Sequence, residues 1–327
     1  MKAVLLKRFG DPQNLYLGDW EKPSPKPNEL LVKVHATALN RADTMQRKGQ
    51  YPPPKGDSPI LGLEIAGTVE AIGKEVADWQ INDQVCGLIG GGGYAEYAVI
   101  PARQALPIPK GLSFEQAAGI PEVFLTAFQA INWIGKLQKD ETILIHAGAS
   151  GVGTAAIQIA KAIGAKVIVT ASKGKHETCL QLGAAKTVDY QSENFEEIVK
   201  EYTDGRGVDL IIDFIAAPYL QQNLNSLNFD GRLVLLALMG GYKLANLNML
   251  PILFRRIQIF GSTLRARTLD YKGKLTKDLY DFAWPLFEKG VFKPVIDSIY
   301  DWNKVIAAHE YMEANKNIGK IILRIRS

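Results

Sequence analysis

Residues 141–175 read ETILIHAGASGVGTAAIQIAKAIGAKVIVTASKGK, and this stretch decides the fold. An apolar run ends in a glycine-rich turn, a helical pattern follows, and a second apolar run closes the stretch. A strand, a glycine-rich turn and a helix in this order predict a dinucleotide-binding unit. In such a unit, backbone N–H groups and the positive end of the helix face a pyrophosphate.

Two registers of the glycine turn are compatible with this prediction. Residues 151–156 match G-x-G-x-x-A formally, whereas residues 148–153 read G-x-S-x-x-G, with a serine in place of the middle glycine. The second register is favoured because it begins directly after the apolar run of the strand. In that register, Gly148 allows the tight turn, Gly153 lets helix and strand pack closely, and Ser150 could add a hydroxyl donor. The alternative is a turn between strand and helix that binds nothing.

The end of the second apolar run bears on the choice of cofactor. NAD sites usually carry Asp or Glu there, which binds the ribose 2′-hydroxyl. Here no acid occurs before Glu177, and Ser172, Lys173 and Lys175 come first. Hydroxyl and ammonium groups attract a 2′-phosphate that a carboxylate would repel. The pattern therefore predicts NADPH, with ordinary solvated lysines at a helix start as the alternative.

The rest of the chain divides into regions of different pattern. The first third contains short β-branched or alternating runs broken by Gly, Pro and Asn, which predicts a β-rich region. From 122 to 264, apolar strands alternate with amphipathic helices, as in a parallel sheet covered on both faces. Residues 265–327 are short for an independent domain. We therefore predict an α/β protein in which a doubly wound Rossmann domain (122–264) is inserted into a β-rich catalytic domain (1–121 and 265–327).

Composition and charge argue against several classes of protein. The 327 residues carry a net charge of +4, and no block of like charge predicts a nucleic-acid or membrane partner. The two cysteines, Cys86 and Cys179, are far apart, which argues against a disulfide framework and fits a reducing compartment. No apolar run at the start is long enough for a signal peptide, and none approaches a membrane span. We expect a cytoplasmic protein.

Several separated motifs, taken in order, resemble a known family. They are NRADTMQRKGQYPPP (40–54), LGLEIAGTVEAIG (61–73), PEVFLTAFQAI (121–131), IHAGASGVGTAAIQIAK (145–161) and YMEANKNIGKIIL (311–323). Together they resemble the zinc-free quinone oxidoreductase branch of the medium-chain dehydrogenase/reductase superfamily. The likeness is closest to the tumour-suppressor-inducible quinone oxidoreductase type, and zeta-crystallin is more distant. It implies that the β-rich catalytic domain is GroES-like.

The resemblance also implies chemistry without a metal. Zinc alcohol dehydrogenases carry Gly-His-Glu where this chain reads Gly62-Leu63-Glu64, so the histidine ligand is absent. No cysteine occurs around residues 38–40, and the four clustered cysteines of the structural zinc lobe are missing. Two cysteines cannot build those sites.

The resemblance places three candidate catalytic residues, Asn40, Asp43 and Tyr51, at the catalytic cleft. The Tyr51 phenol could donate a hydrogen bond or a proton to the oxygen of the acceptor. Its alternative role is to pack a proline-rich loop. Asn40 is better suited to orient the acceptor than to act as a catalyst.

A set of cofactor contacts is carried over by position. Ile215 and Ala216 end the fourth strand where the family usually has glycines, which leaves the approach of the backbone open there. For each loop position the alternative is ordinary turn geometry. The predicted cofactor-binding residues are Gly148, Ala149, Ser150, Gly151, Val152, Gly153, Ser172, Lys175, Tyr190, Thr126, Ile215, Leu238, Met239, Gly240, Leu264, Arg265 and Lys320.

These inferences lead to an NADPH-dependent quinone oxidoreductase that transfers a hydride to small quinones. An NADPH-dependent enone or enoyl-thioester reductase would share the scaffold and the cofactor. A nucleotide-binding protein with little catalysis is the alternative from another class. Residues 257–263, IQIFGST, form a predicted apolar edge strand, and an open edge invites pairing. We therefore expect a homodimer.

Overall fold

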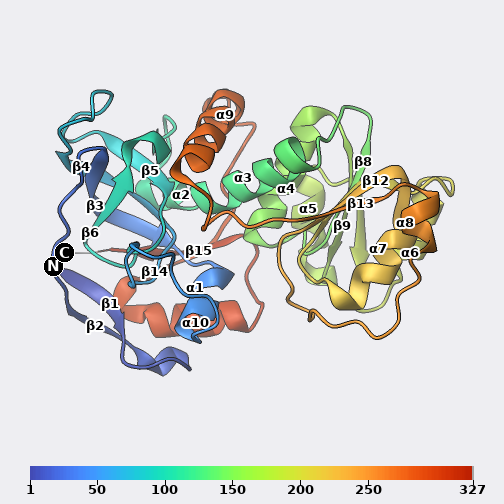
Figure 1. Ribbon diagram of the computed structural model, residues 1–327, viewed down its shortest axis with the longest axis horizontal. Helices are drawn as coiled ribbons and strands as arrows, with labels where there is room; N and C mark the ends of the chain where they lie inside the picture. The colour runs from blue at the N-terminus through green and yellow to red at the C-terminus, as the bar shows by residue number, and fades with distance from the viewer. Residues whose placement is uncertain (326–327) are drawn as a thin grey trace. The chain divides into compact units, whose positions relative to one another are not determined.

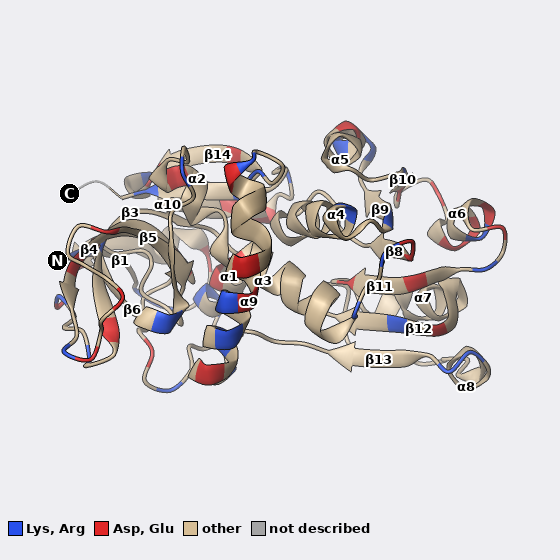
Figure 2. Ribbon diagram, turned by 90° about the horizontal axis from the view of Figure 1, so that it is seen from above, with Lys and Arg blue, Asp and Glu red and all other residues tan. Residues whose placement is uncertain are grey.

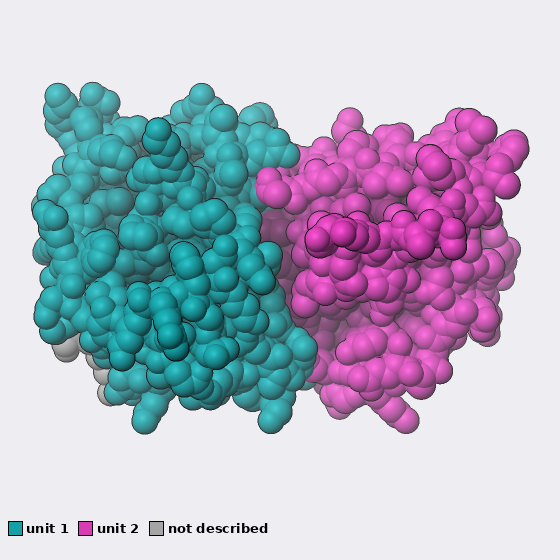
Figure 3. Space-filling model, turned by 60° about the horizontal axis from the view of Figure 1, so that its bottom comes forward, with its two compact units in different colours: residues 1–125, 264–327 teal, residues 126–263 magenta. Residues whose placement is uncertain are grey.

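A computed structural model describes residues 1–325 and divides the chain into two compact units. Unit 1 comprises Met1–Leu125 and Leu264–Ser327, and unit 2 comprises Thr126–Thr263 (Figure 3). The division falls inside helix α3 (Pro121–Phe128), whereas the predicted domain boundary lay at the first residues of that helix. The domain boundaries remain predictions.

Unit 2 is built on one six-stranded sheet with the order β10-β9-β8-β11-β12-β13. All of its strand pairs are parallel, and Figure 2 shows β11, β12 and β13 side by side. Its central strands are apolar and buried on both faces, which is typical of a covered parallel sheet. The predicted α/β fold with a doubly wound parallel sheet is confirmed. The strands are β8 (Thr142–Ile145), β9 (Lys166–Ala171), β10 (Lys186–Asp189), β11 (Val208–Asp213), β12 (Leu227–Leu235) and β13 (Gln258–Gly261).

Helices cover both faces of this sheet. Figure 1 shows α4 and α5 on one side and α6, α7 and α8 on the other. Apolar side chains of α6 and α7 pack with those of the strands in one buried cluster. The helices are α4 (Gly151–Ile163), α5 (His176–Leu182), α6 (Phe195–Tyr202), α7 (Leu220–Ser226) and α8 (Leu250–Phe254). A π-helical stretch η3 (Gln129–Ile134) continues α3, and the 3-10 turns are η4 (Lys173–Lys175) and η5 (Ala217–Tyr219).

The sequence pattern misplaces one boundary in unit 2. It predicts a helix over 219–228 followed by a strand over 231–240, but the strand β12 already begins at Leu227 and ends at Leu235. Leu227 pairs with Val208 of β11, and the register shifts between that pair and the next. Pairing in the sheet thus overrides the local helical pattern. The short helix α8, which begins with a proline in its first turn, was not predicted.

Unit 1 contains a seven-stranded sheet with the order β14-β15-β3-β4-β5-β7, in which β6 also pairs with β3. The pair β14 and β15 is parallel and the others are antiparallel. A separate hairpin joins β1 (Lys2–Leu6) and β2 (Leu15–Asp19). The sheet strands are β3 (Glu29–Ala38), β4 (Glu64–Ile72), β5 (Gln84–Leu88), β6 (Tyr97–Pro101), β7 (Ala105–Pro107), β14 (Ile296–Asp301) and β15 (Lys320–Arg324).

The C-terminal residues complete this β-rich unit. Strand β15 pairs with β3, so segments almost 300 residues apart in the chain lie side by side. Trp302, Val305 and Met312 join the same buried cluster as the N-terminal strands. The helices are α1 (Arg41–Arg47), α2 (Phe114–Ala118), α9 (Leu269–Glu288) and α10 (Val305–Glu313), with 3-10 turns η1 (Pro12–Asn14), η2 (Ala102–Gln104) and η6 (Trp302–Lys304).

Charged residues of both signs are scattered over the chain (Figure 2). None of the helices in residues 1–325 has the length and apolar character needed to cross a membrane.

Candidate active site and dinucleotide site

The glycine-rich turn lies between the end of β8 at Ile145 and the start of α4 at Gly151. Ser150 is the N-cap of α4, and its hydroxyl oxygen accepts a hydrogen bond of 3.1 Å from the Gly153 N–H. The turn therefore occupies the register 148–153. The hydroxyl of Ser150 is used to cap the helix, which satisfies one of its free N–H groups.

The two outer glycines of this register are required by close packing. A Cβ on Gly148 would lie 2.6 Å from the Val169 Cβ of β9, and one on Gly153 would lie 2.4 Å from the Ala147 carbonyl oxygen. Gly148 lies in this turn, in which the left-handed residue is Ala147, with φ 50°. The missing side chain of Gly148 lets the turn approach the neighbouring strand.

This turn fits a pyrophosphate. Its 13-residue helix α4 presents N–H groups at its N-terminus, and its first turn carries no acidic residue. A helix N-terminus of this kind attracts anions through its free N–H groups and its dipole. The predicted residues Ala149, Gly151 and Val152 belong to this turn and to the first turn of the helix.

A buried polar network lies beside the turn. His146 Nδ1 lies 3.0 Å from Thr170 Oγ1, and His146 Nε2 lies 2.8 Å from Asn223 Oδ1. Asn223 donates its amide N–H to Asp213 Oδ2 at 3.0 Å, so its oxygen faces His146 Nε2. Because the Asn223 oxygen can only accept, His146 Nε2 carries a proton. Burial lowers the pKa of His146, which favours the neutral ring. Through its two hydrogen bonds, the ring bridges the end of β8 to β9 and α7.

The same Asp213 supports the turn after the fourth strand. Its carboxylate accepts hydrogen bonds from Ile215 N at 2.6 Å and Ala216 N at 3.1 Å. Ala216 has φ 70° and ψ −115°, a backbone conformation that residues with a side chain rarely adopt. Gly240 packs closely here, since its Cβ would lie 2.8 Å from the Ile215 carbonyl oxygen. The turn thus forms without the glycines expected from the resemblance, because Asp213 braces it.

Most of the other predicted cofactor residues of unit 2 lie near the carboxyl ends of the strands, whereas Thr126 lies in α3. Ser172 and Lys175 are half-buried and follow β9, while Tyr190 is exposed and follows β10. Leu238 and Met239 are exposed beyond the end of β12. Thr126 has a buried hydroxyl oxygen with no hydrogen-bond partner among the described residues.

A buried ion pair is the centre of the candidate site in unit 1. Lys320 Nζ lies 2.7 Å from Glu64 Oε1, and it also donates to Asn40 Oδ1 at 2.7 Å and to the Leu39 carbonyl oxygen at 2.9 Å. An ammonium has three N–H donors, so all three are used. Lys320 was predicted to contact the cofactor. The structure encloses its ammonium within this cluster, and the cofactor contact remains untested.

Asn40 and Asp43 hold the surrounding backbone. Asn40 donates its amide N–H to Glu64 Oε1 at 2.9 Å, and its backbone N–H donates to Asp43 Oδ2 at 2.8 Å. The other Asp43 oxygen accepts from Gly62 N at 2.9 Å. Asp43 is fully buried, and burial raises the pKa of its carboxyl to about 6. The two residues cap α1 and fix the chain before β4, so the structure gives them positioning contacts.

Glu122 belongs to the same cluster, although the sequence analysis did not single it out. Its backbone N–H donates to Glu64 Oε2 at 2.8 Å. Its side chain is only partly buried, in contrast to Asp43 and Glu64. Burial, followed by the neighbouring Glu64 carboxylate, raises the pKa of Glu122 to about 7. Its sequence signal was weak because an acid after proline is ordinary at the start of a helix.

Tyr51 is held by Arg265. The guanidinium carbon of Arg265 lies 5.3 Å from the centre of the Tyr51 ring. Its nitrogens donate to Gln46 Oε1 at 2.7 Å, to the Gly90 carbonyl oxygen at 2.8 Å and to the Tyr51 carbonyl oxygen at 3.4 Å. Burial and the charge of Glu122 raise the pKa of the Tyr51 phenol. Leu264, the residue before Arg265, is buried.

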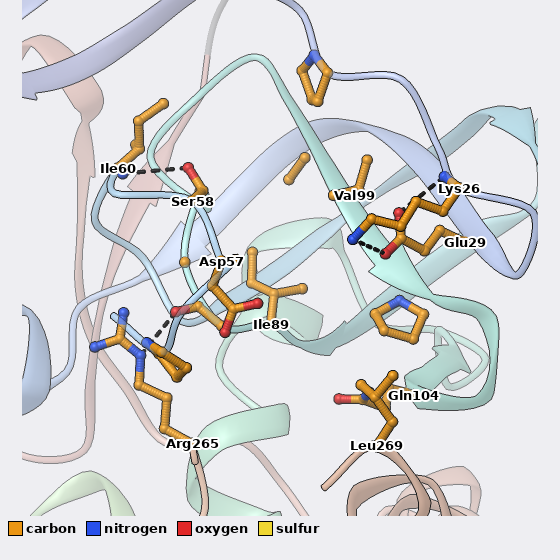
Figure 4. Close-up of a pocket in the computed structure, with 18 of the residues that line it drawn as sticks. Lys26, Glu29, Asp57, Ser58, Ile60, Ile89, Val99, Gln104, Arg265 and Leu269 are labelled. Carbon is orange, nitrogen blue, oxygen red and sulfur yellow. Dashed lines mark hydrogen bonds and ion pairs between the residues drawn. The ribbon is translucent and has the colours of Figure 1, made fainter. Parts of the chain in front are cut away.

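Arg265 also lines a cavity of about 410 Å³ within unit 1 (Figure 4). Figure 4 shows Asp57 and Arg265 on one side of this cavity, and Gln104 and Leu269 on another. Neither Glu64 nor the residues bound to its carboxylate line it. The cavity is therefore distinct from the Glu64 cluster.

The described residues offer no set of side chains suited to a metal ion. In residues 1–325, no three His, Cys, Asp or Glu side chains converge in a way that could hold a metal ion. Glu64, at the position of the Gly-His-Glu motif, is paired with Lys320. Cys86 and Cys179 are buried free thiols.

Comparisons with known proteins agree with this geometry. Residues 26–110 match the alcohol dehydrogenase GroES-like domain, and residues 151–279 match the zinc-binding dehydrogenase family. The chain is 32% identical to the human quinone oxidoreductase over 334 residues, which covers 99% of this chain and 97% of that protein. The chain belongs to the medium-chain dehydrogenase/reductase superfamily. The resemblance found in the sequence, including the GroES-like unit, is confirmed.

Solved structures of the medium-chain dehydrogenase/reductase superfamily extend the comparison. The CurK enoyl reductase superposes with a TM-score of 0.89 at 28% identity, covering 99% of each chain. A mycobacterial protein solved in complex with NADPH has a TM-score of 0.88 at 27% identity, covering 99% of this chain and 100% of that one. These relatives support an oxidoreductase that uses a nicotinamide dinucleotide.

Proposed function

We propose that the protein is an NADPH-dependent quinone oxidoreductase that transfers a hydride to small quinones without a metal. The observation that carries this proposal is the half-buried Tyr51 phenol, held by Arg265 beside the carboxyl cluster of unit 1. A phenol in this position can donate a hydrogen bond to a quinone oxygen. The full-length similarity to the human quinone oxidoreductase supports the choice of acceptor.

The cofactor proposal rests on unit 2. NADPH, when bound, supplies the hydride. The turn from Gly148 to Gly153 would hold the pyrophosphate on its backbone N–H groups. Ser172 and Lys175 would bind the 2′-phosphate, because they follow β9 where NAD sites usually have an acid. The relative solved with NADPH is consistent with this choice.

On the acceptor side, the residues of unit 1 have separate tasks. Tyr51 would orient the quinone by a hydrogen bond to one of its oxygens. Asn40 and Asp43 would act indirectly, because their hydrogen bonds fix the chain around Glu64. Placing the acceptor correctly is the main requirement, because a quinone accepts a hydride readily.

The experiment is a steady-state assay of NADPH oxidation with a panel of ortho- and para-quinones and a panel of enones. We expect turnover with quinones, unchanged after treatment with a metal chelator. Turnover with enones alone would contradict the quinone assignment and would favour the second candidate, an enone or enoyl-thioester reductase. The similarity to the CurK enoyl reductase is the observation in favour of that candidate. Tight binding of NADPH without oxidation by any acceptor would favour a nucleotide-binding protein.

We also propose a cytoplasmic homodimer. The edge strand β13 has an unpaired side, and its residues Gln258, Ile259 and Gly261 are exposed. Leu253 and Phe254 of the preceding α8 are 73% and 68% exposed. Exposed apolar side chains next to an open strand edge favour pairing with a second copy. The two free cysteines are consistent with a reducing compartment.

A further inference from the structure

We propose that Glu122 is the group that supplies the proton to the acceptor oxygen, with Tyr51 orienting that oxygen. This inference rests on the proposed function, because it concerns the same reaction. It starts from three carboxyl groups, those of Asp43, Glu64 and Glu122, that are gathered in one cluster of unit 1.

The three carboxyl groups differ in their partners and exposure. Both oxygens of Asp43 accept backbone N–H bonds, and both oxygens of Glu64 accept hydrogen bonds, one of them from Lys320. Asp43 and Glu64 are each 0% exposed. None of the described residues donates a hydrogen bond to the carboxyl of Glu122, and the residue as a whole is only partly buried. Glu122 is therefore the member of the cluster that can exchange a proton with a bound molecule.

The two cations near Glu122 donate their hydrogen bonds to other acceptors. Lys320 uses its three donors on Glu64, Asn40 and the Leu39 carbonyl oxygen. Arg265 donates to Gln46 and to two backbone carbonyl oxygens. Both still favour the charged form of Glu122 at a distance, but the negative charges of Glu64 and Asp43 oppose it.

The sum of burial and the neighbouring charges favours the protonated form of Glu122 up to about neutral pH. Burial is the largest cause, and the Glu64 carboxylate is the next; together they raise the pKa of Glu122 to about 7. A carboxyl group with a pKa near the working pH is suited to general acid catalysis. Tyr51, whose pKa is raised, keeps its proton under these conditions and can act as a hydrogen-bond donor.

A quinone that accepts a hydride from NADPH gains two electrons and one proton, and it needs one further proton to become a neutral hydroquinone. The O–H bond of Glu122 breaks as the O–H bond of the hydroquinone forms. The carboxylate left behind regains its proton from water through the exposed part of its side chain.

The experiment compares the wild type with Glu122→Gln and with a control, Glu288→Gln, an exposed residue at the end of α9. The first readout is the infrared band of a protonated carboxyl in the cofactor-free protein. We expect a band that titrates near pH 7 in the wild type and in Glu288→Gln, and that is missing in Glu122→Gln, where only the titration of Asp43 near pH 6 remains. The second readout is kcat with a quinone as a function of pH. It should fall above about pH 7 in the wild type, and Glu122→Gln should lose this dependence together with about 10²- to 10⁴-fold in rate.

A Glu122→Asp variant provides the check on folding, because it keeps the acid and should retain a pH-dependent limb. An unchanged pH profile in Glu122→Gln, or the absence of a carboxyl titrating near pH 7 in the wild type, would overturn the role of Glu122. Failure of the wild type to oxidise NADPH with any quinone would overturn the proposed function itself. The two failures are distinguishable because the infrared readout requires no turnover.

Discussion

Lys320 Nζ lies 2.7 Å from Glu64 Oε1, and the two side chains are 4% and 0% exposed. This ion pair joins β15, which follows unit 2 in the chain, to β4, which precedes it. Removing one partner of a buried pair leaves an uncompensated charge in a medium of low dielectric constant, which is far more costly than removing both.

We therefore expect Lys320→Met to lower the free energy of unfolding by about 3–5 kcal/mol. The double variant Lys320→Met with Glu64→Leu should recover most of that loss. Urea unfolding followed by circular dichroism measures both values. A double variant as unstable as the single one would show that the cluster stabilises the unit through its hydrogen bonds to Asn40 rather than through charge pairing.

The packing of the glycine turn predicts a second difference in stability. Gly148→Ala should destabilise the protein by about 1–3 kcal/mol, because the new methyl group would meet Val169. Gly174→Ala is the matched control, because a Cβ there meets nothing within 4 Å. Thermal unfolding of both variants checks this. Equal stability of the two would mean that the backbone of the turn shifts freely away from β9.

The cofactor proposal predicts a selective loss of affinity. Lys175→Ala should weaken the binding of NADPH by roughly 10- to 100-fold, which is the range of a hydrogen bond to a charged group. The affinity for NADH should be nearly unchanged. Fluorescence titration with both dinucleotides measures the two constants. Equal weakening of NADPH and NADH would show that Lys175 does not read the 2′-phosphate.

His309 gives the protein a defined sensitivity to acid. Burial lowers the pKa of this histidine from 6.5 to about 3, and its Nε2 faces the Tyr94 hydroxyl at 3.4 Å. Below pH 6.5 the unfolded chain binds a proton that the folded protein does not. The contribution of the neutral His309 ring to the free energy of unfolding is therefore complete above pH 6.5. It is lost progressively as the pH falls toward 3.

The wild type should thus lose up to about 1.4 kcal/mol per pH unit relative to His309→Phe within this window. Denaturant unfolding of both proteins between pH 4 and pH 8 measures the difference. A difference that is independent of pH would mean that the pKa of His309 is the same in the folded and unfolded states.

The proposed dimer predicts a change in mass. Leu253→Asp on α8 should convert the dimer into a monomer in size-exclusion chromatography with light scattering. Phe9→Asp is the control, since Phe9 is 69% exposed but belongs to unit 1. Loss of the dimer in the control but not in Leu253→Asp would place the interface elsewhere.

Local patterns in the sequence were sufficient to predict the architecture. Buried runs such as Ile143–Ile145 and the helices between them repeat within about 20 residues, so periodicity predicts the parallel sheet of unit 2. The failures came where contacts distant in sequence override the local pattern. Leu227 belongs to a strand because it pairs with Val208.

The candidate site was less predictable for the same reason. Lys320, Asn40 and Glu64 are separated by 24 to 280 residues in the chain, and only the pairing of β15 with β3 brings the lysine to the other two. The position of Glu122 in the first turn of a predicted helix likewise gives no information on which residues it contacts. Its properties depend on Glu64 and on the cations Lys320 and Arg265, which donate to other acceptors.

The strand order β14-β15-β3 has a consequence for synthesis on the ribosome. When residues 1–125 have emerged, β3 still lacks its partner β15, and Glu64 still lacks its lysine. All of unit 2 is synthesised before β15 and its Lys320. The parallel sheet of unit 2 can therefore form while β3 still has an unpaired edge and Glu64 an unpaired charge. The nascent N-terminal segment is therefore the part of this chain that we expect molecular chaperones to protect.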